Sequence, residues 1–232
     1  HVFAVEYPGY GLCPGEANAA SVCENAHLAF RFLVEVLRWP IDDIIVFGRS
    51  IGCGPALSIA AEYRVYGLVL VCPFASFKQL CEEYFGSVIA NLIDDRFPNK
   101  ELMSKVRSPL LLIHGKKDTV VPWTHGRDLY AVCRARKRLV TPAEMHHNIN
   151  LHSDAHILVL PMLQFFRLPD YSFEEMRVPD WVFAKPLCRH SPREPLKAAD
   201  GPSTWARRLI SADRGLSQVY EKQYPGASQV YL

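Results

Sequence analysis

The sequence lacks a long apolar run, a strong net charge and cysteines at metal-binding spacing, and each absence excludes a class of protein. The longest apolar candidate, residues 65–72, is strand-sized, whereas a membrane-spanning helix needs roughly 18 apolar residues. The net charge is +2, so charge does not indicate a nucleic-acid-binding protein. Seven cysteines, an odd number without a C-x-x-C pair, indicate reduced thiols, and we therefore expect a cytoplasmic protein.

The first part of the chain alternates between apolar runs of strand length and helical apolar patterns. Continuously apolar strands that alternate with helices predict an α/β fold, with a mostly parallel sheet covered by helices on both faces. The expected strands are residues 1–7, 43–48, 66–73, 108–115 and 137–145. The expected helices are residues 22–37, 51–63, 77–93, 123–135 and 153–167, the last kinked at Pro161.

The pattern changes after residue 168. Seven prolines fall within residues 169–232, and no sustained period appears there. We therefore expect a domain over residues 1–168 and an extension over residues 169–232 that is largely disordered. Because the chain begins directly with a strand-like segment at His1, we also expect that the first strands of this domain are missing from it.

The stretch Gly48-Arg49-Ser50-Ile51-Gly52 lies where a predicted strand turns into a predicted helix. This G-x-S-x-G pattern at a strand–helix junction is typical of a nucleophile elbow, which holds its serine in an unfavourable backbone conformation above the sheet. We expect side chains at positions 48 and 52 to collide with neighbouring backbone, which would require glycine there. The alternative is a glycine-rich loop in which Ser50 caps the helix.

A serine nucleophile needs a base, an acid that orients the base, and donors for the oxyanion. The Ile51 N–H, at the start of the helix, is a candidate oxyanion donor. Asp118 follows the strand at 108–115 and is the best candidate acid, because Asp94, Asp95 and Asp128 lie in helical patterns.

The candidate bases lie in the stretch "AEMHHNINLHSDAH". His146 and His147 both follow the last expected strand, so either could be the base. His152 and His156 have the i, i+4 spacing of a metal pair, but there is no H-E-x-x-H pattern and no cysteine nearby. We therefore expect neither a metal nor another cofactor. His27, His114 and His125 are interpreted as structural.

Four stretches together resemble the α/β-hydrolase superfamily, and more narrowly the α/β-hydrolase-domain-17 group, which includes protein depalmitoylases. They are "VFAVEYPGYGLCPGE", "IIVFGRSIGCGPA", "SPLLLIHGKKDTVVP" and "HHNINL". The resemblance covers about residues 2–168. The group's His-Asn-Asp motif matches His147 and Asn148, which favours His147 over His146 as the base, although Ile149 replaces the aspartate.

The resemblance implies a serine hydrolase that cleaves an ester or thioester with Ser50, Asp118 and His147, and that acts on lipidated proteins as a palmitoyl-protein thioesterase. Relatives include esterases and peptidases, so a carboxylesterase or serine peptidase is an alternative. A further alternative is an inactive chain of the same fold that acts through protein interaction.

The resemblance also implies features that lie upstream of His1. Relatives contact membranes through an N-terminal cysteine cluster, so we expect peripheral membrane association through that missing region. They also carry an upstream His-Gly loop that supplies a second oxyanion donor. With the Ile51 donor alone, we expect a loss of transition-state stabilisation on the order of 3 kcal/mol.

Overall fold

The computed structural model describes residues 1–92, 94–151, 154–168 and 178–179. The chain divides into two units, His1–Arg177 and Val178–Leu232, and every helix and strand of the described residues lies in the first. The extension expected over residues 169–232 lies almost entirely outside the described residues, and so does His152. The prediction of a disordered extension therefore stays a prediction.

A four-stranded parallel sheet forms the centre of the first unit, in the order β1-β2-β3-β4. Its strands are β1 (Ile45–Arg49), β2 (Gly67–Val71), β3 (Leu110–Ile113) and β4 (Lys137–Val140). The helices are α1 (Ala19–Arg31), α2 (Cys53–Glu62), α3 (Phe77–Phe85), α4 (Ser87–Ala90), α5 (Asn99–Lys105), α6 (Trp123–Val132) and α7 (Val159–Phe166). A π-helical turn, Phe32–Val36, follows α1, and 3₁₀ turns occupy Ile41–Asp43 and Ser50–Gly52.

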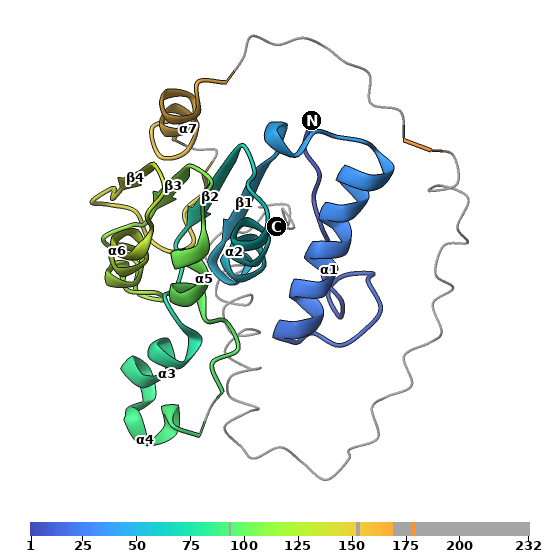
Figure 1. Ribbon diagram of the computed structural model, residues 1–232. Coiled ribbons are helices and arrows are strands. Elements are labelled where there is room, and N and C mark those ends of the chain that lie inside the picture. The colour runs from blue at the N-terminus through green and yellow to red at the C-terminus, as the bar shows by residue number, and fades with distance from the viewer. Residues whose placement is uncertain (93, 152–153, 169–177, 180–232) are drawn as a thin grey trace, which may run out of the picture. The chain divides into compact units, whose positions relative to one another are not determined.

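Both faces of the central strands are buried, which explains their continuously apolar sequences. Leu68 and Leu70 of β2 pack with α2, α5 and α6, which Figure 1 shows in a row along one face of the sheet. Val69 and Val71 point the other way, toward α7 and the segment that follows β4. The sheet is thus covered on both faces, as the sequence predicts.

The helix that follows the carboxyl end of β2, α3, has clear capping residues at both of its ends. Ser76 begins α3 by accepting a hydrogen bond from the Gln79 amide, and Gly86 ends it with a φ of +80°. Figure 1 shows α3 and α4 at the end of the sheet where β2 leaves it. The predicted helix over residues 77–93 is wrong as one element, because Gly86 divides it into α3 and α4.

Two other predicted elements are wrong, and one helix was not predicted. Residues 1–7 form no strand and are mostly exposed, because no strand pairs with them among the described residues and β1 is an edge of the sheet. The five expected strands are therefore four. The closing helix begins at Val159, not at residue 153, so Pro161 occupies its first turn, where a missing N–H is tolerated without a kink. α5 has no counterpart among the predicted helices.

None of the helices within the described ranges is both long enough and apolar enough to cross a bilayer. The expectations of a cytoplasmic location and of peripheral membrane contact stay predictions.

Candidate active site

Ser50 directly follows β1 and has a φ of +51°. This value lies in the left-handed region, which residues other than glycine rarely adopt. The chain reverses here with Gly48 packed against the start of α2. A Cβ on Gly48 would lie 2.6 Å from the Gly52 carbonyl oxygen and 2.9 Å from the Cys53 Cα. Glycine at position 48 is thus required for the turn, as the sequence predicts.

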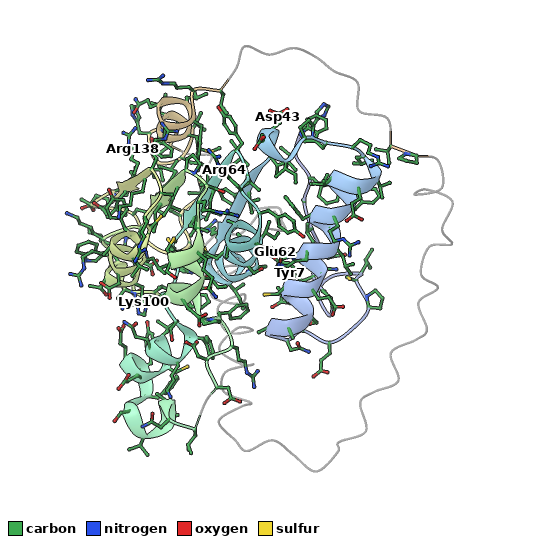
Figure 2. All side chains as sticks on the ribbon, viewed as in Figure 1. Tyr7, Asp43, Glu62, Arg64, Lys100 and Arg138 are labelled. Carbon is green, nitrogen blue, oxygen red and sulfur yellow. The ribbon has the colours of Figure 1, made fainter. Side chains whose placement is uncertain are left out.

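The collision predicted at Gly52 is wrong. A Cβ there would meet only the Tyr7 hydroxyl among the described residues, at 3.7 Å, an ordinary contact. Gly52 also has right-handed helical φ and ψ of −63° and −13°, which any residue can adopt. Tyr7, which Figure 2 labels between α1 and α2, therefore lies near the elbow, and burial raises its pKa to about 12.

His147 lies between Ser50 and Asp118 and hydrogen-bonds both. Its Nε2 is 2.9 Å from Ser50 Oγ, and its Nδ1 is 2.7 Å from Asp118 Oδ2. A carboxylate only accepts, so Nδ1 carries the proton and the Nε2 lone pair faces the serine hydroxyl. The structure thus brings together the three residues that the sequence proposes as nucleophile, acid and base, each in a segment that follows a strand.

Asp118 is buried and receives several hydrogen bonds. Its Oδ1 accepts from the amides of Val120 and Val121, at 2.9 and 2.7 Å. Burial, the largest single influence, raises the pKa of Asp118, but hydrogen bonds from His114, His147 and the Val121 amide hold that pKa well below its usual range. The carboxylate is therefore ionised and can orient the imidazole.

The Ile51 amide lies in the first turn of the helical segment that begins at Ser50 and continues into α2. Amides in the first turn of a helix have no acceptor within the helix and point toward its amino end. This position beside the Ser50 hydroxyl suits an oxyanion donor.

Cys72, which follows β2, is a neighbour of the acid that the sequence analysis did not single out. Donor atoms of Cys72, Asp118 and His147 lie within 4.8 Å of one another, a set that could ligate a metal. Burial and the adjacent Asp118 carboxylate raise the pKa of the Cys72 thiol to about 12, so it keeps its proton. Because His147 Nδ1 and Asp118 Oδ2 also bond each other, the cluster is better explained as part of the hydrogen-bonded site than as a metal centre.

The competing candidates lie elsewhere. His146 is exposed and makes none of the contacts that His147 makes with Ser50 and Asp118. Asp95 accepts hydrogen bonds from amides at the start of α3, and Asp128 pairs with Arg127 on the surface.

The structure contains a second serine–histidine pair that the sequence did not predict. His27 Nε2 is 3.1 Å from Ser58 Oγ, and His27 Nδ1 is 3.6 Å from a Glu62 carboxylate oxygen. Ser58, however, lies in the middle of α2 and donates to the Pro55 carbonyl. With ordinary helical backbone and no helix amino end beside it, Ser58 lacks the features of an elbow.

Arg49, like Cys72, is a residue of the site that the sequence analysis did not single out. Its guanidinium donates to the carbonyl oxygens of His147 and Ile149, and so connects the elbow with the loop that carries the histidine. Position 49 falls on an unspecified residue of the G-x-S-x-G pattern, which gives no sequence signal for such a contact.

Comparisons with known proteins show what the chain is similar to. No protein-family model matches the chain. The α/β hydrolase domain-containing protein 17B of Homo sapiens is 32% identical over 158 residues, which cover 66% of this chain and 52% of that protein. The α/β hydrolase domain-containing protein aho-3 of Caenorhabditis elegans is 30% identical over 154 residues, covering 66% and 46%. The chain thus spans about half the length of the curated relatives that it matches.

Two solved structures show the same fold. Mouse α/β hydrolase domain-containing protein 10 has a TM-score of 0.53 at 18% identity, covering 70% of this chain and 76% of that one. An acylaminoacyl peptidase of Pyrococcus horikoshii has a TM-score of 0.52 at 11% identity, covering 66% of this chain and 29% of that one. The chain therefore has the α/β-hydrolase fold.

Proposed function

We propose, from the premise that the chain has the α/β-hydrolase fold and resembles the α/β hydrolase domain-containing 17 proteins, that it is a serine hydrolase of esters or thioesters. The observation that carries the proposal is the position of His147, within hydrogen-bond distance of both Ser50 Oγ and Asp118 Oδ2. Such a chain of contacts, with the serine on a strained turn, suits acyl transfer.

In the proposed reaction, Ser50 Oγ attacks the acyl carbonyl carbon while His147 Nε2 accepts the hydroxyl proton. Asp118 stabilises the imidazolium that forms and keeps Nδ1 protonated. The Ile51 amide donates to the oxyanion of the tetrahedral intermediate. The imidazolium then gives its proton to the leaving alcohol or thiol, and an acyl-serine remains.

Deacylation repeats the same steps with water as the nucleophile. His147 takes a proton from the water, whose oxygen bonds to the acyl carbon of the acyl-serine. Collapse of the second tetrahedral intermediate releases the carboxylic acid and restores the Ser50 hydroxyl. Apart from the substrate and this water, each step uses only side chains and amides of the chain itself.

For the substrate we propose a long-chain acyl thioester, as in a palmitoylated cysteine of a protein. The resemblance to the domain-17 group supports this choice. A second support is the apolar surface of α3, α4 and the turn after α4, where Tyr84, Phe85, Val88 and Leu92 are each at least half exposed. The Tyr84 hydroxyl donates to the carbonyls of Thr119 and Val120, directly after Asp118, so this surface begins beside the acid.

The test of the enzyme is labelling by a fluorophosphonate probe, which reacts with activated serines. We expect the wild type to be labelled and Ser50→Ala to be unlabelled. Ser58→Ala is the matched control, since Ser58 also lies beside a histidine but not on an elbow, and it should be labelled like the wild type. A folded wild type that is never labelled would favour the alternative of an inactive interaction protein.

The substrate class needs a separate comparison. One preparation is given palmitoyl thioester and palmitoyl oxyester substrates of equal chain length, together with short-chain counterparts. The rates of hydrolysis of these substrates are then compared. Preference for the long-chain thioester is expected. Preference for short oxyesters, or cleavage of acylated peptides at the amide, would replace the depalmitoylase proposal with a carboxylesterase or a peptidase.

A further inference from the structure

The residue directly before the proposed nucleophile reaches the loop that carries the proposed base. One guanidinium nitrogen of Arg49, Nη2, lies 2.8 Å from the His147 carbonyl oxygen and 3.1 Å from the Ile149 carbonyl oxygen. These distances are those of hydrogen bonds from a charged donor to neutral acceptors. A single nitrogen thus holds alternate carbonyls of the loop, on either side of Asn148.

The loop is fastened by two different parts of the molecule. Before the histidine, the carbonyls of Pro142 and Met145 accept hydrogen bonds from the amides of residues 116–117, in the loop that carries the acid. From the histidine onward, Arg49 supplies the donor. The acid loop therefore positions the first half of the histidine loop, and the elbow positions the second half.

The topology of the sheet explains why this contact matters. Arg49 ends β1, whereas the histidine loop follows β4, and these strands form opposite edges of the four-stranded sheet. Strand pairing relates the elbow to the histidine loop only through two intervening strands. The Arg49 side chain connects the two segments directly, beside the atoms that would exchange the proton.

We propose that Arg49 is a positioning residue that holds His147 Nε2 at hydrogen-bonding distance from Ser50 Oγ. The inference rests on the proposed function, since it assigns a role in the reaction of the same site. Arginine suits the role because its planar guanidinium stays charged and offers several donors in a fixed geometry. Lysine has a single ammonium group on a shorter side chain.

The first test compares turnover of p-nitrophenyl butyrate by Arg49→Met and by a matched control, Arg136→Met. Arg136 also donates through Nη2 to a carbonyl, that of Phe165, at 3.0 Å, but it precedes β4 and so lies at the opposite ends of the strands from the site. Since misplacement of a reacting group by about 1 Å can cost 10²-fold, we expect kcat of Arg49→Met to fall ~10- to 100-fold.

The pattern of the kinetic constants separates positioning from a general loss of stability. KM of Arg49→Met should change much less than its kcat, Arg49→Lys should recover part of the lost kcat, and Arg136→Met should keep the wild-type kcat for each folded molecule. Equal kcat for the wild type and Arg49→Met would overturn the proposal, as would an equal loss in Arg136→Met.

A second readout does not depend on activity. Amide hydrogen exchange of peptides covering residues 143–151 should be faster in Arg49→Met than in the wild type, and unchanged in Arg136→Met. Unchanged exchange in Arg49→Met would overturn the proposal even if turnover fell. If the wild type proved inactive, the proposed function would fail, while the exchange result would still support or reject the link between Arg49 and the loop.

Discussion

His114 and Asp118 face each other in the interior, with the histidine Nε2 3.4 Å from Asp118 Oδ2 and both side chains fully buried. The same Nε2 lies 2.9 Å from the Val121 carbonyl oxygen. Both partners are acceptors, so Nε2 carries a proton. His114 Nδ1 has no hydrogen-bond partner among the described residues, which favours a neutral ring. His114 thus supports the Asp118 carboxylate as a neutral donor.

The lowered pKa of Asp118 predicts how stability depends on pH. Because the pKa is lower in the folded protein than in the unfolded chain, the carboxylate contributes stability that is present above the unfolded pKa of about 3.9 and is lost as pH falls toward the folded pKa. We expect the free energy of unfolding to fall more steeply from about pH 5 to pH 3 in the wild type than in Asp118→Asn.

Urea unfolding at several pH values measures this difference. Asp128→Asn is the control, because Asp128 pairs with Arg127 on the surface, and it should keep the wild-type pH dependence. If Asp118→Asn and the wild type lose stability in parallel as pH falls, Asp118 is not the group responsible.

The positive φ of Ser50 predicts that the side chain needed for activity lowers the stability of the protein at this position. Glycine adopts a φ of +51° without the strain that any Cβ adds, whereas Ser50→Ala keeps that strain. Ser50→Gly should therefore be more stable than Ser50→Ala by about 1 kcal/mol, and neither should react with a fluorophosphonate. Thermal and urea unfolding of both variants check this, and an alanine variant as stable as the glycine variant would show that the turn is unstrained.

The three residues of the proposed site could be selected from the sequence because each follows a strand. Parallel strands place their carboxyl ends at one edge of the sheet, so Ser50, Asp118 and a histidine after β4 were expected to meet there. Patterning also identified β2 and β3, because strands buried on both faces are continuously apolar.

What the sequence could not show depends on partners distant in the chain. Residues 1–7 have the pattern of a strand, yet a strand exists only where another pairs with it, and pattern alone does not reveal the partner. The Arg49 contact likewise joins residues about a hundred positions apart, and Cys72 reaches the acid only through the sheet. Such contacts are tertiary and leave no local signal.

Alanine should destabilise the protein at Gly48 but have little effect at Gly52. In Gly48→Ala the new Cβ would lie within 3 Å of Gly52, Cys53 and Ala56, two of these contacts being with backbone atoms that cannot move aside. We expect a destabilisation of about 2 kcal/mol or more, or failure to fold. Gly52→Ala should fold with stability within about 1 kcal/mol of the wild type, because its φ and ψ are helical and its surroundings are open. Urea unfolding compares the two, and equal losses would contradict the geometry of the elbow.

The buried thiol of Cys72 should be inert in the native protein. Alkylation requires a thiolate and access to it, and Cys72 is fully buried with a pKa raised to about 12, whereas Cys13 is partly exposed. Treatment with iodoacetamide at pH 8, followed by peptide mass spectrometry, should modify Cys13 and leave Cys72 intact, while urea should expose both.

Zinc provides the complementary test of the Cys72 cluster. If burial and the adjacent Asp118 carboxylate keep the thiol protonated, added zinc should neither alter Cys72 alkylation nor quench fluorophosphonate labelling of Ser50. A metal bound at Cys72, Asp118 and His147 would instead draw His147 Nδ1 away from Asp118 and remove the orientation of the base. Loss of labelling in zinc that Cys72→Ser abolishes would therefore show that the cluster is a metal site as well as part of the hydrogen-bonded site.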